Sequence, residues 1–204
     1  MRIGIDFDNT LVTYDGVFRA AAARFAAIPP GVGRGKRDIR DYLLALPDGE
    51  LTWQRLQGFV YGKGISGAQM FTGADAFLRR CRAEGAEVVI VSHKTEFGHH
   101  DPDRVNLREA ARTWMTARGF FAADGYAITA DSLFFEATRA EKLGRIASLD
   151  CNLFIDDLEE VLDDPDFPRQ VTRILFAQAG LEGPVPPYPV CRSWNDIEKL
   201  VFCD

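Results

Sequence analysis

Five short, continuously apolar runs recur along the chain, and stretches with helical spacing of apolar residues separate most of them. Runs of this length that do not alternate with polar residues are typical of strands covered by helices on both faces. Alternation of such strands with helices predicts an α/β fold with a mainly parallel sheet. The expected strands are residues 2–6, 87–92, 132–136, 151–156 and 172–177.

The intervening stretches favour helices at 73–85, 103–119 and 139–149, and the first two of these stretches end in a glycine that suits a helix C-terminus. A last helix is expected at 193–202, with Ser193 as its N-cap. The Gly- and Pro-rich stretch 180–190 before it predicts an extended connection.

The interval 11–72 has a different pattern and contains no convincing strand. It offers three helix candidates, at 16–27, 37–46 and 51–61, which is more than one crossover connection needs. We therefore expect an α/β core made of residues 1–10 and 73–204, with residues 11–72 inserted as a small helical cap.

Length and charge restrict the possible partners. A chain of 204 residues suits one domain with an insertion, and its formal net charge of −6 argues against broad nucleic-acid binding. The same charge means that an anionic substrate would need locally placed cations.

The apolar runs are too short to cross a bilayer, and Asp6 interrupts the first one before it can resemble a signal peptide. The four cysteines lie far apart, without a CxxC pair, and predict free thiols in a reducing compartment: Cys81, Cys151, Cys191 and Cys203. The sequence thus predicts a cytoplasmic protein without a membrane partner, and leaves the oligomeric state open.

Polar side chains gather where the expected strands end. In an open parallel sheet, ligands bind at the carboxyl ends of the strands, so these residues should meet at one edge. Carboxylates in such a cluster suit Mg²⁺, while a hydroxyl and an ammonium suit phosphate oxygens. The residues concerned are Asp6, Asp8, Thr10, Ser92, His93, Lys94, Asp156 and Asp157, with Lys142 on the helix before the last pair.

These residues resemble the four motifs of the haloacid dehalogenase (HAD) superfamily of phosphatases. "DFDNT" matches the first motif, DxDx[T/V], and "VVIVS" supplies the Ser of the second. Lys142 fits the third motif and "LFIDD" the fourth, and the motifs occur in the family's order from residue 6 to residue 157. The resemblance implies a doubly wound sheet, with a cap inserted between the first and second motifs.

The resemblance also implies a role for each motif residue. Asp6 would be the nucleophile that forms an aspartyl-phosphate, and Asp8 the general acid and then the general base. Thr10, Ser92 and Lys142 would bind phosphate, and Lys142 would also offset the charge of the aspartates. Mg²⁺ would be held by Asp6, by the backbone carbonyl of Asp8 and by Asp157, with Asp156 behind as an outer neighbour.

The expected activity is Mg²⁺-dependent hydrolysis of a small phosphomonoester, with a sugar phosphate slightly favoured over a nucleotide. The second acid, Asp8, favours phosphatases over dehalogenases, which have no leaving oxygen to protonate. The alternative is a signalling or binding module of the same fold that uses the aspartate–Mg²⁺ site without turnover.

The sequence leaves the roles of several residues undecided. Lys94 competes with Lys142 for the role of the cation, and His93 and Lys94 are candidate substrate contacts because they adjoin Ser92. Trp53 and Tyr61 lie on one face of a cap helix, which suits either core packing or a surface that contacts substrate. The three histidines have no spacing that predicts a zinc site.

Overall fold

The computed structural model describes residues 1–33, 35–181 and 183–202. The chain divides into two compact units, each built from separate segments. The first, here called the sheet unit, contains Met1–Val12, Met70–Lys94 and Gly119–Asp204. The second, here called the helical unit, contains Thr13–Gln69 and Thr95–Arg118. Cys203, one of the predicted free thiols, lies outside the described residues.

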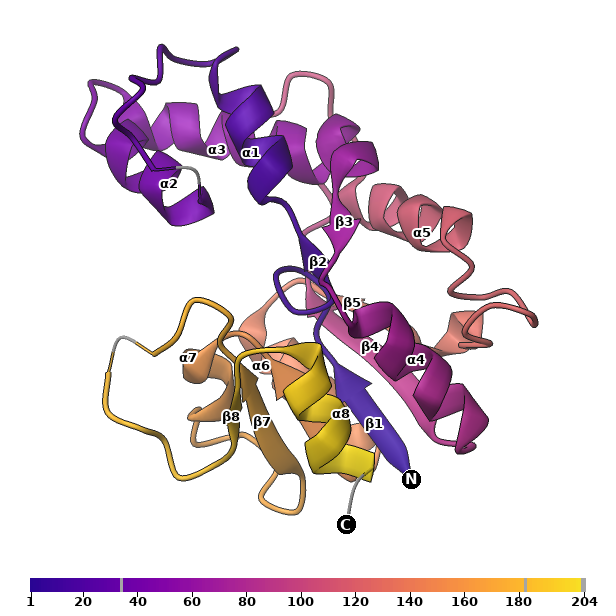
Figure 1. Cartoon of the computed structure of the whole chain (residues 1–204). Helices are drawn as coiled ribbons and strands as arrows, with labels where there is room; N and C mark the ends of the chain where they lie inside the picture. Colours follow the sequence, from indigo (N-terminus) through magenta and orange to yellow (C-terminus); the bar gives the residue numbers. More distant parts are fainter. Residues whose placement is uncertain (34, 182, 203–204) are drawn as a thin grey trace. The chain divides into compact units, whose positions relative to one another are not determined.

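The sheet unit is built on six parallel strands in the order β5-β4-β1-β6-β7-β8 (Figure 1). In chain order this is 3-2-1-4-5-6, the order of a doubly wound sheet. The prediction of a doubly wound, parallel α/β fold is therefore confirmed. The strands are β1 (Arg2–Ile5), β4 (Glu87–His93), β5 (Leu133–Glu136), β6 (Leu153–Asp156), β7 (Thr172–Phe176) and β8 (Val190–Cys191).

Helices cover both faces of this sheet, which explains why its strands are apolar without alternation. On one face, α6 (Arg139–Ser148) and α7 (Glu159–Leu162) pack in an apolar cluster with Val89, Val91 and Phe154. On the other face, α4 (Ala74–Ala83) and α8 (Trp194–Phe202) meet through Phe77 and Trp194, whose ring centroids are 5.0 Å apart.

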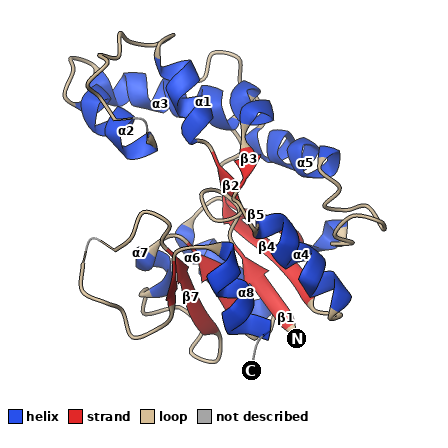
Figure 2. Ribbon diagram, viewed as in Figure 1, coloured by secondary structure: helices blue, strands red, loops and turns tan. Residues whose placement is uncertain are grey.

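The helical unit contains α1 (Asp15–Ala22), α2 (Lys36–Leu44), α3 (Gly49–Tyr61), the 3₁₀ helix η1 (Lys63–Gly67) and α5 (Leu107–Ala117), coloured as helix in Figure 2. Its core is aromatic: Phe18 stacks on Trp53 at 5.2 Å between centroids, and Tyr61 meets Phe18 edge-on at 5.8 Å. The three predicted cap helices are all present, within a few residues of the expected limits.

A close approach of two glycines joins α3 to the loop before α5. A Cβ atom on Gly98 would lie 2.7 Å from the Cα of Gly58, a distance that real Cβ contacts do not reach. Glycine at both positions therefore lets the backbone of the loop lie directly on the helix.

The helical unit differs from the predicted insertion, because it also contains residues 95–118. From the sequence, this segment is expected in the core, as a helix at 103–119. The helix exists, but it begins at Leu107, where Asn106 caps it by accepting hydrogen bonds from the backbone N–H groups of Arg108 and Glu109. Its apolar face packs against α3 and η1, and a periodic apolar face does not specify its partner.

Three short strands were not predicted. β2 (Val12–Thr13) and β3 (Gln69–Met70) form a separate two-stranded sheet at the two ends of the insertion, so the expectation of no strand there was wrong. β8 lies at the end of the stretch expected to be an extended connection. Each of these strands has two residues, too few for a periodic pattern to identify. No helix of the described residues is long and apolar enough to span a membrane.

Candidate active site

The candidate site lies where β1 and β6 end side by side. β1 pairs with β4 on one side and β6 on the other, so the direction of winding reverses next to it. Such a switch point is where doubly wound folds bind ligands. Asp6 follows β1 directly, and its backbone N–H donates to the carbonyl of Ile155 at 2.9 Å. Asp156 is the last residue of β6, so the register brings two carboxylates together.

A tight turn after β1 positions the second acid of the first motif. The N–H groups of Leu11 and Val12 both donate to the carbonyl of Phe7, and Asn9 adopts a left-handed conformation with φ of 64°. Asparagine tolerates that conformation better than most residues. Thr10 is buried, and its hydroxyl donates to Asp157 Oδ1 at 3.1 Å, which ties this turn to the fourth motif.

Lys142 connects two of the buried carboxylates. Its Nζ lies 2.7 Å from Asp6 Oδ1 and 2.6 Å from Asp156 Oδ2, and all three residues are buried. The helix that carries it starts with a capping box, in which Thr138 accepts from the N–H of Glu141. Burial would lower the pKa of Lys142, but the charges of Asp6 and Asp156 outweigh burial and raise that pKa. The ammonium form is therefore held firmly in the site.

The pKa of the Asp6 carboxyl group is raised to about 7. Burial is the main cause, the charges of Asp156 and Asp8 act in the same direction, and the attraction of Lys142 opposes them. A bound cation next to Asp6 would act in the opposite direction and favour the carboxylate.

Lys94 pairs with Asp8, a contact that the sequence does not predict. Its Nζ lies 2.7 Å from Asp8 Oδ2, and the lysine side chain is 2% exposed while that of Asp8 is 17% exposed. The available signal was the spacing at the end of β4: Lys94 follows the last residue of β4 directly and lies two residues after Ser92, which favours the same side of an extended chain. Lys94 and Lys142 thus contact different aspartates.

Ser92 presents an unused hydroxyl to the interior of the sheet unit. It is fully buried, and its Oγ has no hydrogen-bond partner among the described residues. Leaving a buried polar group unpaired costs about 1–3 kcal/mol. Such a group at the end of β4 is suited to bind a ligand oxygen.

Three carboxylates lie close enough to share a metal ion. One oxygen each of Asp6, Asp156 and Asp157 lies within 4.8 Å of the others. Oxygen donors of this kind fit a hard divalent cation. Asp156 already receives Lys142 on one oxygen and the N–H of Leu158 on the other, at 3.0 Å. This arrangement suits the expected role of Asp156 as an outer neighbour, with Asp6 and Asp157 nearer to the ion.

The remaining candidates have other surroundings. The His93 ring nitrogen Nε2 lies 2.9 Å from the carbonyl of Ala137, within the sheet unit. Trp53 is 5% exposed and stacked on Phe18, so it packs in the core of the helical unit. Tyr61 is half-buried and contacts Tyr14 edge-on at 4.9 Å.

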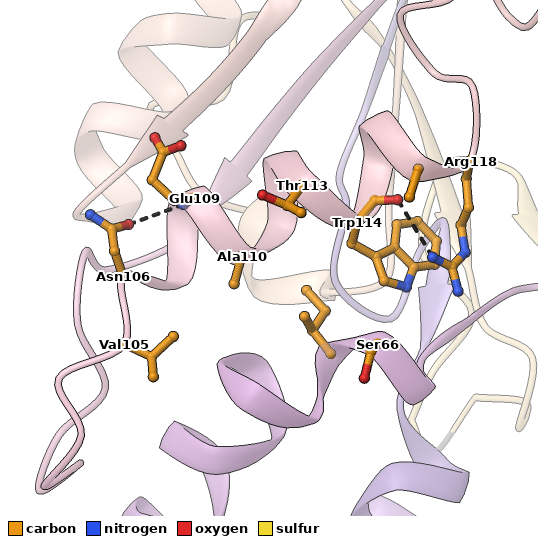
Figure 3. A pocket seen from close by; sticks show the side chains of 10 residues that line it. Ser66, Val105, Asn106, Glu109, Ala110, Thr113, Trp114 and Arg118 are labelled. Carbon is orange, nitrogen blue, oxygen red and sulfur yellow. Dashed lines mark hydrogen bonds between the residues drawn. The ribbon is translucent and has the colours of Figure 1, made fainter.

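A separate hollow lies within the helical unit, between η1 and α5 (Figure 3). It has a volume of about 440 Å³, and neither Trp53 nor Tyr61 lines it. Two of its polar side chains already contact other groups of the protein: Asn106 caps α5, and the Arg118 guanidinium lies 3.8 Å from the centroid of the Trp114 ring. The hollow shares no residue with the candidate active site.

No protein-family model matches the sequence, and no curated protein is significantly similar to it. Solved structures do match. A haloacid dehalogenase-like hydrolase of Streptococcus pneumoniae has a TM-score of 0.65 at 14% identity, covering 98% of this chain and 97% of that one. Protein Tyrosine Kinase A of Mycobacterium tuberculosis gives 0.64 at 13% identity, with coverages of 98% and 97%. The HAD-hydrolase YfnB of Bacillus subtilis, solved with magnesium bound, gives 0.58 at 12% identity, with 98% of both chains covered.

These similarities extend over nearly the whole chain, but at such low identity they establish architecture and not reaction. A kinase appears beside the hydrolases, so the chemistry has to be argued from the site. The chain has the fold of the haloacid dehalogenase-like hydrolases.

Proposed function

We propose that this protein is a Mg²⁺-dependent phosphomonoesterase that works through an aspartyl-phosphate on Asp6. The observation that carries this proposal is the buried lysine bridge, in which Lys142 contacts both Asp6 and Asp156. It keeps a cation beside a carboxylate at the switch point of the sheet, where a phosphate dianion would have to bind.

The charges of the site support this function. As carboxylates, Asp6, Asp156 and Asp157 carry three negative charges against the single positive charge of Lys142, and a divalent cation would balance the remaining two. Asp6, Asp157 and the backbone carbonyl of Asp8 would hold the ion. Mg²⁺ would supply neutralisation of phosphate charge and orientation of the substrate. The magnesium bound in YfnB supports this choice of ion.

The first half of the reaction would transfer the phosphoryl group. An Asp6 oxygen attacks phosphorus, the bond from phosphorus to the ester oxygen breaks, and Asp8 gives its proton to the departing alkoxide. Ser92, Thr10 and Lys142 are the proposed contacts to phosphate. The unpartnered Ser92 hydroxyl would find its acceptor in a phosphate oxygen.

The second half would release phosphate. Asp8, now a carboxylate, takes a proton from a water molecule as that water attacks the phosphorus of the aspartyl-phosphate. The bond between phosphorus and the Asp6 oxygen breaks, which restores Asp6 and yields inorganic phosphate.

The substrate class is proposed on narrower grounds. We favour a small sugar phosphate over a nucleotide, and we assign the cap role to the helical unit. Trp53 packs against Phe18 and Tyr61 against Tyr14 and Phe18, so these aromatic rings are engaged with each other and not presented for stacking on a base.

Cys81, Cys151 and Cys191 are buried free thiols, which supports a reducing, cytoplasmic location.

The decisive experiment is hydrolysis of p-nitrophenyl phosphate with Mg²⁺, followed by a panel of sugar phosphates and nucleotides. Activity should be lost with EDTA and restored by Mg²⁺. Asp6→Asn should abolish it, while Asp131→Asn, a change at an exposed aspartate, should not. Wild-type protein that hydrolyses nothing in the panel would contradict the proposal. A stable aspartyl-phosphate without turnover, detected by mass spectrometry, would favour the alternative of a signalling module.

A further inference from the structure

The ion pair between Lys94 and Asp8 is unusual in its placement. Lys94 lies at the carboxyl end of β4, where its backbone N–H donates to the carbonyl of Glu136 at 2.9 Å. The side chain is almost completely buried, and its Nζ reaches Asp8 Oδ2 at 2.7 Å. The lysine is therefore the inner member of the pair and the aspartate the outer one.

Stability alone does not account for this lysine. A buried ammonium loses its hydration, and replacing a buried ion pair by apolar residues of similar volume is often neutral or stabilising. Lys142 already supplies a cation to Asp6 and Asp156. A second buried lysine that contacts a different aspartate indicates a separate task.

We propose that Lys94 is a positioning residue for Asp8. Asp8 lies beyond the end of β1, forms only an isolated β-bridge with Val12, and is followed by Asn9 with a left-handed backbone, so the six-stranded sheet does not fix the direction of its carboxyl group. The buried Nζ of Lys94 gives that group a fixed contact on one oxygen. With that oxygen held by Lys94, the carboxyl group would be oriented to give its proton to the ester oxygen that leaves. This inference depends on the proposed phosphatase function.

The experiment compares two substrates that differ in their need for a proton donor. p-Nitrophenolate leaves readily without protonation, whereas the alkoxide of glycerol 2-phosphate needs a proton from Asp8. Because kcat/KM reports the steps up to transfer of phosphate to Asp6, it isolates the leaving-group step. In Lys94→Met, kcat/KM for the alkyl phosphate should fall about tenfold to 10²-fold further than for the aryl phosphate, since a misplacement of about 1 Å can cost 10²-fold.

Further variants separate positioning from other roles. Lys94→Arg keeps a cation and should show a smaller substrate-selective loss than Lys94→Met. If the methionine variant does not fold, Lys94→Gln gives the same comparison. Arg80→Met removes an exposed ion pair with Glu84 in the same unit and should leave both rates unchanged. Thermal unfolding of each variant identifies losses that reflect folding.

Each outcome decides the question. Equal losses of kcat/KM on both substrates would mean that Lys94 binds phosphate and would overturn its positioning role. Unchanged rates on both would overturn it as well. Wild-type protein inactive on both substrates would refute the proposed function itself, which is a different result from an active wild type with an unselective variant.

Discussion

The two units bury very different side chains. The sheet unit buries charges, with Asp6, Asp156, Lys94 and Lys142 all nearly inaccessible to solvent. Among the described residues the helical unit buries no charged side chain, and its interior is apolar, with Phe18 stacked on Trp53. Buried charges are tolerated only when paired or bound to a metal, whereas buried rings need no partner of a particular kind. Side-chain chemistry therefore indicates the function of the sheet unit far more than that of the helical unit.

The largest effect on the chemistry is expected from Asp8→Asn. The substitution keeps the shape of the side chain but removes its proton transfer, so kcat should fall roughly 10²–10⁴-fold. Because asparagine cannot pair with the buried ammonium of Lys94, thermal stability should fall as well, so kcat is compared at a temperature well below both melting temperatures. Steady-state kinetics on an alkyl phosphate, with a thermal melt beside it, measure both. Unchanged kcat would remove Asp8 from the mechanism.

Lys142→Met tests whether the buried charges of the sheet unit depend on their pairing. It leaves Asp6 and Asp156 buried without their ammonium, which should lower the free energy of unfolding by about 3–5 kcal/mol. Urea unfolding at neutral pH measures this loss. Arg145→Met, which removes the partly exposed ion pair with Glu136, should cost no more than about 1 kcal/mol. Equal losses of unfolding free energy in the two variants would mean that the buried contacts of Lys142 stabilise the protein no more than a partly exposed ion pair does.

Trp53→Ala tests whether the buried rings of the helical unit contribute to stability and not to the chemistry. Removing a buried indole stacked on Phe18 should cost about 3–5 kcal/mol of stability, by loss of apolar burial and creation of a cavity. In folded protein, kcat on p-nitrophenyl phosphate should stay close to that of wild type, because the residue lies outside the charged site. Activity at a temperature well below the melt provides the measurement. A fall in kcat as large as that of Asp8→Asn would contradict the view that the chemistry depends on the sheet unit and not on this residue of the helical unit.

The smallest effect concerns pH and metal affinity. The pKa of Asp6 in the folded, metal-free protein is raised from 3.8 to about 7, so this group binds a proton at pH 6 and has mostly lost it at pH 8. A metal ion requires the carboxylate and must displace that proton, so Mg²⁺ affinity should rise about tenfold from pH 6 to pH 8 and level off above. Calorimetric titration at several pH values gives the comparison. Affinity independent of pH would exclude proton displacement from Asp6.

The sequence predicted the sheet unit well, because each motif follows an apolar strand whose residues can be recognised individually. The strand ends place Asp6, Asp156 and Asp157 together, and Lys142 reaches them from α6. The ion pair of Lys94 with Asp8 was missed, although both residues were named as candidates. Their contact depends on the turn after β1, whose course follows from hydrogen bonds to Phe7 and not from any periodic pattern.

The helical unit was predicted less completely. Its helices were expected, but the assignment of residues 95–118 to it was not. That assignment reflects the packing of α5 against α3 and η1 and the approach of Gly98 to Gly58, which are contacts between segments far apart in the chain. Two glycines without side chains leave no apolar signal from which a contact can be inferred.

The position of β1 has a consequence for local opening of the structure. β1 is paired on both sides, and the N–H of Asp6 continues that ladder by donating to Ile155. Amides in such a central strand exchange with solvent only when a large part of the sheet opens. The proposed nucleophile thus lies on the backbone segment expected to exchange last. Local fluctuations that loosen surface loops would leave this backbone unchanged, so the segment that carries the proposed nucleophile should keep its place almost until the whole sheet unfolds.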